Sequence, residues 1–374
     1  MAYRFFAPPP ARAATGRAAQ VYQQMRDDFP GPAPTFHALS VAPDVMAATW
    51  ALMRESLLAN RDGRSSDGRS SDGPSSDSRA TPHRAGDGAS RVDREVVAAA
   101  VSRANDCRFC ADAHVTLLHG LGEHDLAETI ARGGSPPQPA QAELAGWARA
   151  SRHPRATGWT SRYNPQLTGT LLAFHFINRV VSALLAPDLL PGGLQRSSTA
   201  RAAGGRLLAR SLRTSIVAGR SLPLLDVANG PPPAWAGNDP VGAAWVALRD
   251  ATARGGDLLG DLARHTVTAT VRWEDGGHPA DPVAWAGDLV RDLPAKERVG
   301  ARIALLAAFA PEAITAGDIG LWRLTHRSDA DLVRLVAYGA ITATEHVAQA
   351  LDPAPALTHA HDADREEPSC AELS

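Results

Sequence analysis

The sequence predicts an all-α protein built from two related helical halves. Apolar residues recur at the three- and four-residue spacing of a helix face in residues 45–59, in residues 171–185 and through much of residues 240–351. Residues 281–314 also show the pattern of residues 43–59 joined directly to residues 94–110, so the second half looks like a repeat of the first. A chain of 374 residues has room for two or three domains.

The composition is that of a soluble globular protein, with 44% hydrophobic and 21% charged residues. A net charge of −2 gives no electrostatic reason to expect binding to nucleic acid or to anionic membranes. No apolar run reaches the roughly 18 residues of a membrane span, and the first residues lack the features of a signal peptide. We therefore expect a cytoplasmic protein that binds neither nucleic acid nor membranes.

The first half, residues 1–188, is expected to be the redox-active helical domain. Its early part is helical with breaks at the prolines of residues 30–34, and residues 45–59 form an amphipathic helix whose Trp50 packs in the core. Residues 61–91 contain no Val, Ile, Leu, Met or aromatic residue, and Ser-Ser-Asp recurs there every five residues. Such a polar segment buries too little surface to offset its ordering entropy, so we expect a disordered insertion.

The later helices are expected to end at Gly120 and Gly133, and a long apolar helix follows at residues 171–185. His175, Asn178 and Arg179 share one face of that helix, and we expect them to serve packing. Residues 189–239 are rich in Gly, Arg, Ser and Pro and predict a linker with one short helix at residues 204–212. Residues 240–352 form the second helical domain, and residues 353–374 a disordered tail.

Residues 95–114 (EVVAAAVSRANDCRFCADAH) hold the groups best suited to chemistry. Cys110 follows Cys107 by three residues and His114 follows Cys110 by four, so a helix places the three side chains on one face. Glu95 lies upstream in an Ala/Val-rich helix, where a carboxylate needs a polar neighbour. Asn105 and Asp106 suggest the N-cap of the second helix, which puts Cys107 in its first turn, where the helix dipole favours thiolate.

This arrangement resembles the AhpD-like alkylhydroperoxidases of the carboxymuconolactone decarboxylase family. Their motif is a Glu, a CxxC twelve residues later and a His four residues after the second Cys, and Glu95, Cys107, Cys110 and His114 meet every offset. The resemblance covers residues 40 to 130. It implies an AhpD-like helical fold, (alkyl)hydroperoxide reduction in an antioxidant role, no bound organic cofactor and no metal, and subunits that associate as a homo-oligomer.

A hydroperoxidase needs a thiolate to attack the O–O bond, a proton for the alkoxide, and a second thiol to resolve the sulfenic acid. Glu95 and His114 are suited to a relay that moves the proton. Helix-end electrostatics favour Cys107 as the more acidic thiol, whereas the resemblance implies that Cys110 meets the hydroperoxide and Cys107 the reductant. We adopt the assignment of the family, in which the dithiol reductant is a lipoyl-bearing protein.

Other interpretations use the same residues. Thiol–disulfide exchange without peroxide specificity needs no further group, and a non-catalytic helical interaction protein would bury the cysteines as packing residues. Structural zinc usually takes four ligands, and a second ligand pair is missing. Lactone decarboxylation, which names the wider family, leaves the CxxC unexplained.

The second half lacks the thiols. When Glu297 is aligned with Glu95, the positions of Cys107, Cys110 and His114 hold Phe309, Glu312 and Ala316. This half is therefore expected to keep the fold, to lack dithiol chemistry and to pair with the first half. Cys370 lies in the acidic tail without a neighbour in sequence that would lower its pKa, and we expect it to be a bystander.

Overall fold

Helices make up the secondary structure of this chain. The structure, a computed structural model, describes residues 3–29, 33–60, 89–160, 163–188 and 191–351. Within these ranges it contains no strand, only the isolated bridges Tyr3–Leu185 and Asn60–Val217. The all-α prediction is confirmed. Most of the predicted insertion, residues 61–88, and the predicted tail lie outside the described residues.

The described residues form fifteen α-helices. In the first half these are α1 (Gly16–Asp28), α2 (Pro34–Leu39), α3 (Pro43–Met53), α4 (Arg91–Ala104), α5 (Arg108–Gly120), α6 (His124–Ala131), α7 (Pro139–Ala150) and α8 (Pro165–Leu184). They are followed by α9 (Ser198–Leu212), α10 (Pro240–Ala253), α11 (Asp261–Glu274), α12 (Pro282–Leu289), α13 (Ala295–Phe309), α14 (Ala316–Trp322) and α15 (Asp329–Gln349).

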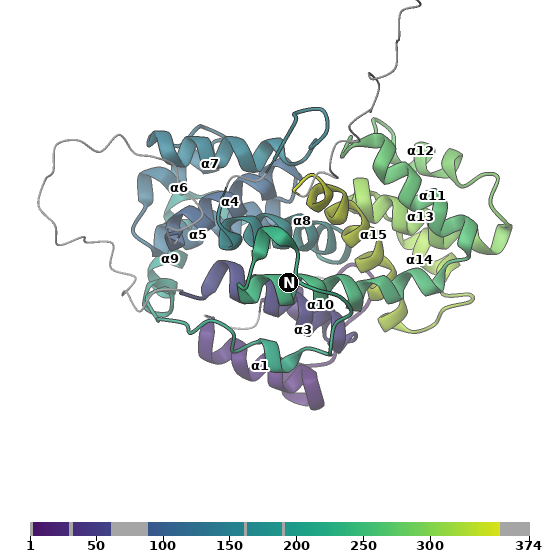
Figure 1. Ribbon diagram of the computed structural model, residues 1–374, viewed down its shortest axis with the longest axis horizontal. Helices are drawn as coiled ribbons and strands as arrows, with labels where there is room; N and C mark the ends of the chain where they lie inside the picture. The colour runs from purple at the N-terminus through teal and green to yellow at the C-terminus, as the bar shows by residue number, and fades with distance from the viewer. Residues whose placement is uncertain (1–2, 30–32, 61–88, 161–162, 189–190, 352–374) are drawn as a thin grey trace, which may run out of the picture.

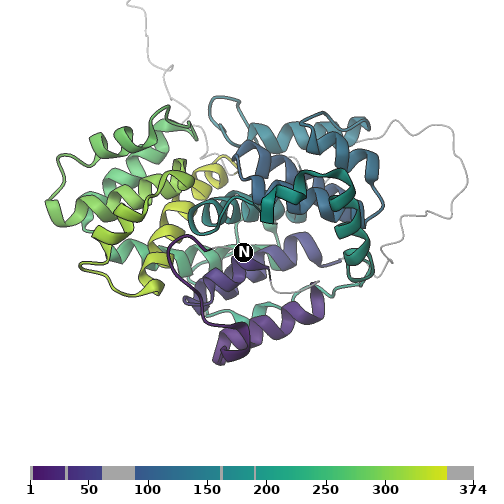
Figure 2. The same ribbon diagram turned by 180° about the vertical axis from the view of Figure 1, so that it is seen from behind.

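Helix α8 lies at the centre of the molecule. It packs against α3 and α4 of the first half and against α15 of the second, while α4–α7 and α11–α14 lie on opposite sides of it (Figures 1 and 2). Among the described helices, α8 alone is long and apolar enough to cross a membrane, but 94% of that stretch is buried in protein. This burial is that of a core helix, and it explains the high apolar content of residues 165–184.

The segment between the halves is more structured than the sequence predicts. Helix α9 begins at Ser198 rather than at residue 204, and it packs along α5. The backbones approach so closely that a Cβ on Gly120 would lie 2.9 Å from the carbonyl oxygen of Gly205. The two glycines make the contact possible, and this tertiary contact outweighs the low helix propensity of glycine. The proposed domain boundaries at 188, 239 and 352 stay predictions.

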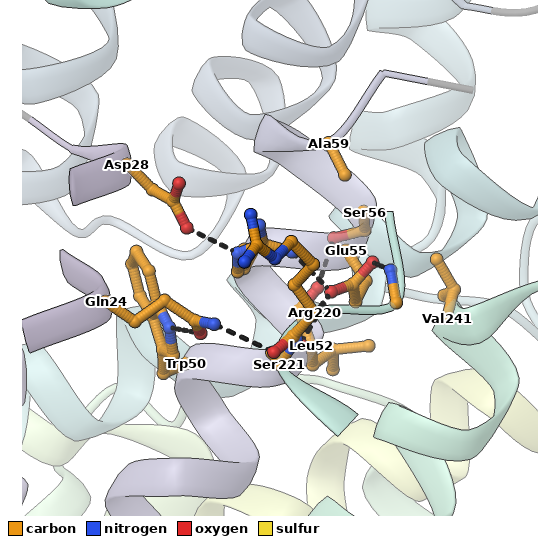
Figure 3. A network of polar contacts seen from close by, with 12 residues as sticks. Gln24, Asp28, Trp50, Leu52, Glu55, Ser56, Ala59, Arg220, Ser221 and Val241 are labelled. Carbon is orange, nitrogen blue, oxygen red and sulfur yellow. Dashed lines mark hydrogen bonds and ion pairs between the residues drawn. The ribbon is translucent and has the colours of Figure 1, made fainter. Parts of the chain in front are cut away.

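A buried ionic network ties the later part of this segment to the first half (Figure 3). A π-helical turn, Arg54–Leu58, continues α3 and buries both Arg54 and Glu55. Arg54 donates to Glu55 at 2.7 Å and to Asp28 at 2.6 Å. The Glu55 carboxylate also accepts the Gly219 backbone N–H and the Ser221 hydroxyl, both at 2.6 Å. Ser221, in the segment that the sequence predicts to be a linker, is fully buried.

Candidate active site

The thiol motif occupies the turn between α4 and α5. Helix α4 begins at the N-cap Ser90, whose hydroxyl accepts the Asp93 backbone N–H at 3.1 Å. Residues 89–91 are therefore ordered, and the predicted insertion was drawn too long at that end. The predicted N-cap is also wrong. Asn105 ends α4, Asp106 reverses the chain in the left-handed region (φ 54°), and Cys107 itself is the N-cap of α5. Aspartate tolerates this φ better than most residues.

Helix α8 holds this turn in place. The Asn105 amide donates to Nδ1 of the buried His175 at 3.2 Å, and Nε2 of His175 donates to the Ser151 hydroxyl at 2.7 Å. Burial lowers the pKa of His175 well below its ordinary value, and the charges of Arg179 and Arg152 lower it further. The imidazole is thus neutral. His175, which the sequence predicts to serve packing, therefore also holds the turn that carries the thiols.

Arg179 of the same face binds carbonyl groups. It donates to the carbonyl of His175 at 2.7 Å and to that of Ala308 at 2.8 Å. Burial lowers its pKa to about 9. These contacts link α8 to α13 of the second half.

The two thiols of the motif lie close together. Cys107 is 2% exposed and Cys110 is 4% exposed, and each interacts with the other sulfur. Burial by itself raises the pKa of Cys107, but hydrogen bonds with Cys110 and with the Ser182 hydroxyl outweigh it, so the pKa is lowered. The pKa of Cys110 is raised well above its ordinary value, first by burial and then by its interactions with Cys107. The pKa of Cys107 is thus lowered and that of Cys110 raised, and the interaction between the two thiols contributes to both shifts.

Glu95 and His114 form the predicted pair. The His114 Nδ1–H donates to the fully buried Glu95 carboxylate at 2.6 Å, and the imidazole packs edge-on against Phe174 at 4.3 Å between ring centroids. Arg91 donates to the other carboxylate oxygen at 2.8 Å. Burial alone raises the pKa of Glu95, but Arg91 and His114 outweigh it, so the pKa is lowered and the group is ionised.

A cavity of about 490 Å³ opens onto Cys107. Its apolar wall comes from Phe109 at the start of α5 and from Val181 and Leu185 near the end of α8. Ser182 lies between them, and Cys110 does not line the cavity. Of the two cysteines, only Cys107 is among the residues that line this cavity.

The charged rim of this cavity includes a residue of the second half. Asp106 and Arg108, which flank Cys107 in sequence, line the cavity together with Arg4 and Glu312. Arg4 donates to the carbonyls of Ser182 at 2.8 Å and of Glu312 at 2.9 Å, so it holds α8 and the second half together at the rim. The residues that line the cavity therefore come from the N-terminal segment, from the rest of the first half and from the second half.

The structure pairs Glu95 with His114, and Cys107 with Cys110, on α4, on α5 and at the turn between them. Two further groups were missed. Arg91 lies four residues before Glu95 on one helix, a spacing that reveals ion pairs in sequence. Nothing in the sequence near Ser182 indicates a role in the site, because Ser182 lies near Cys107 only as a result of the packing of α8. In the described part of the chain, no group of three or more His, Cys, Asp and Glu residues is arranged to hold a metal ion.

Comparison with known proteins places this site in a family. Residues 81–150, which contain Glu95 and the CxxC motif, match the carboxymuconolactone decarboxylase family. Over 354 residues the chain is 30% identical to a Mycobacterium tuberculosis protein named alkyl hydroperoxide reductase, with 91% of this chain and 92% of the relative aligned. The chain belongs to the carboxymuconolactone decarboxylase family. This AhpD-like member has no significant match among solved structures.

Proposed function

We propose that this carboxymuconolactone decarboxylase family member reduces organic hydroperoxides through a dithiol–disulfide cycle of Cys107 and Cys110, in an antioxidant role. One observation carries the proposal: two interacting thiols, of which Cys107 lines a cavity of about 490 Å³, lie on the same pair of helices as a buried carboxylate–imidazole pair. The name of the mycobacterial relative supports the same class of reaction.

The cycle balances with the groups present. A thiolate attacks the peroxide, an S–O bond forms, the O–O bond breaks, and the alkoxide takes up a proton to leave as an alcohol. The second thiol attacks the sulfenic sulfur, an S–S bond forms, and the hydroxyl leaves as water with the proton of that thiol. An external dithiol then returns two electrons and two protons.

The Glu95–His114 pair supplies the proton transfer. Ionised Glu95 accepts the Nδ1–H of His114, which leaves Nε2 as the acceptor for a thiol proton. His114 lies one turn beyond Cys110 on the same face of α5, so the imidazole is placed on the thiol side of the helix. The carboxylate stabilises the imidazolium until the alkoxide takes the proton.

Consumption of cumene hydroperoxide with dihydrolipoamide as the electron donor tests the proposal. We expect turnover in the native protein and in Cys370→Ser, the matched control, and a loss of more than 100-fold in Cys110→Ser. A Cys110→Ser rate equal to the native rate contradicts the dithiol cycle. The lipoyl-bearing reductant, the homo-oligomer and the cytoplasmic location remain predictions.

Two alternatives give different results in the same assays. A thiol–disulfide oxidoreductase without peroxide specificity exchanges disulfides with dihydrolipoamide but leaves cumene hydroperoxide intact. A helical interaction protein with inert buried cysteines reacts slowly with iodoacetamide at pH 7. The lowered pKa of Cys107 and its position on the cavity favour a reactive thiol over the inert pair.

We also propose that the second half is a degenerate repeat that supports the first. Helix α10 (PVGAAWVALRDATA) resembles α3 (PDVMAATWALM), and each runs directly into a short non-α turn, Arg254–Leu258 and Arg54–Leu58 respectively. Helix α3 packs on α10, and α8 packs on α15. These similarities support a repeat that begins at residue 240, the boundary that the sequence predicts.

A further inference from the structure

We infer that the cavity at Cys107 takes organic hydroperoxides that carry a carboxylate, the class of the fatty-acid hydroperoxides, and that Arg108 binds this carboxylate. The substrate class rests on the proposed peroxidase function, and it makes Arg108 a specificity-determining residue. The order in which the two sulfurs react stays as the family resemblance implies it.

The cavity combines an apolar wall with a charged rim. Phe109, Val181 and Leu185 supply apolar side chains, and Ala186 and Pro187, which follow α8, add to the wall. Its volume of about 490 Å³ is that of a small-molecule site. A ligand that suits both parts is amphipathic, because it buries a hydrocarbon portion against the wall and keeps a charged group at the rim.

Arg108, the first residue of α5, is an exposed cation at this rim. Its side chain makes no hydrogen bond or ion pair with the residues that the structure describes. A guanidinium whose N–H groups are unoccupied binds a carboxylate through two parallel hydrogen bonds. Arg108 therefore has the donors that an anionic ligand in the cavity requires.

Arg4 adds positive charge to the rim, but its donors are occupied. Its guanidinium donates to the carbonyls of Ser182 at 2.8 Å, Ala183 at 3.0 Å and Glu312 at 2.9 Å. Carbonyl groups satisfy these N–H donors without carrying a net charge, so the charge of Arg4 persists while its geometry is fixed. Direct contact with a substrate carboxylate is left to Arg108.

The two carboxylates of the rim have partners outside the cavity. The Asp106 side chain is 80% exposed and lies 4.0 Å from Arg152. The Glu312 side chain is 57% exposed, and its Oε1 lies 3.1 Å from Nε2 of His278. Neither Arg152 nor His278 lines the cavity. Because water and salt screen such exposed charges, direct contact decides which ligand group binds, and Arg108 makes that contact with an anion.

The preference for linoleic acid hydroperoxide over its methyl ester tests this role, with dihydrolipoamide as the donor. The two substrates share the peroxide and the hydrocarbon chain and differ in charge. We expect the native kcat/KM to be about fivefold higher for the acid, through a lower KM, which is the contribution of one exposed ion pair. Arg108→Gln should bring the ratio of the two kcat/KM values to about one, whereas Arg108→Lys, which keeps the charge, should retain a preference for the acid.

The ratio cancels any general change in thiol reactivity, because both substrates meet the same thiols. Arg210→Gln removes an exposed arginine of α9 that does not line the cavity, and this matched control should keep the native ratio. An Arg108→Gln ratio equal to the native ratio overturns the inference, and so does an equal loss of preference in Arg210→Gln.

Binding of decanoate, a carboxylate without a peroxide, gives a readout that needs no turnover. In isothermal titration calorimetry its Kd should rise about fivefold in Arg108→Gln and stay at the native value in Arg210→Gln. If no hydroperoxide is consumed while decanoate shows this dependence on Arg108, the proposed function fails and the carboxylate site stands. Equal Kd values in the native protein and in Arg108→Gln overturn the site even if hydroperoxides are consumed.

Discussion

Replacing Glu95 with glutamine should reduce peroxide turnover far more than it reduces stability. The carboxylate is fully buried and accepts from His114 at 2.6 Å and from Arg91 at 2.8 Å. Glutamine keeps the shape of the side chain but removes the charge that stabilises the His114 imidazolium. General acid–base assistance contributes about 10²–10⁴-fold, so kcat/KM should fall by about 100-fold or more.

The effect on stability is limited by Arg91, whose side chain is 11% exposed and lies in the first turn of α4. Leaving it with a weaker partner should lower the free energy of unfolding by about 2 kcal/mol. Because the pKa of Glu95 is lowered in the folded state, the stabilisation is fully present above the unfolded pKa of about 4.3. It is lost as the pH falls through the folded pKa. The glutamine variant should lack this dependence on pH.

Steady-state rates with cumene hydroperoxide give kcat/KM, and urea unfolding gives the free energy of unfolding. Glu143→Gln, an exposed change on α7, is the matched control and should leave both at native values. A Glu95→Gln enzyme within threefold of the native kcat/KM would refute the relay. A loss of rate that disappears at a lower temperature, where the variant is fully folded, would also refute the relay.

Three further predictions concern the scaffold, each measured by urea unfolding. Glu55→Gln should lower the free energy of unfolding by about 3–5 kcal/mol, because a buried charge network loses its central carboxylate. A loss no larger than that of Glu143→Gln would contradict the role of this network. Because His175 stays neutral when folded, stability should decrease as the pH falls below about 6.5, and His175→Gln should abolish this decrease. Gly120→Ala should destabilise the protein by about 1–3 kcal/mol, since its Cβ would lie 2.9 Å from a backbone oxygen of α9, and an unchanged midpoint would refute this close packing.

The sequence was sufficient for the parts of the site that are local in the chain. Glu95, Cys107, Cys110 and His114 fall on two consecutive helices, so their spacing determines which side chains meet. Helix periodicity also predicted α3 and α8, although α8 begins at Pro165, six residues before the predicted start. The role of Asp106 was misread, because a helix N-cap and a left-handed reversal favour the same residue types.

What the sequence could not predict depends on tertiary packing. Arg4 meets Ser182 across 178 residues of chain, and nothing in the local composition of either segment signals that contact. Helix α9 carries two adjacent glycines, Gly204 and Gly205, that weaken any prediction of helix, and only its packing on α5 explains why it forms. In the sequence, the adjacent charged residues Arg54 and Glu55 likewise suggest an exposed helix surface. They are buried as a pair because residues 219–221 pack over them.

The contacts of Arg4 have a consequence for the order of events during synthesis. The reactive thiols are complete once residue 114 has been translated, but the carbonyls of Pro311, Glu312 and Ile314 that hold Arg4 at the rim emerge from the ribosome roughly two hundred residues later. At translation speeds of about 5–20 residues per second, the nascent chain carries uncovered cysteines for about ten seconds or longer. Whatever oxidant is nearby during that interval meets the thiols before their binding cavity exists.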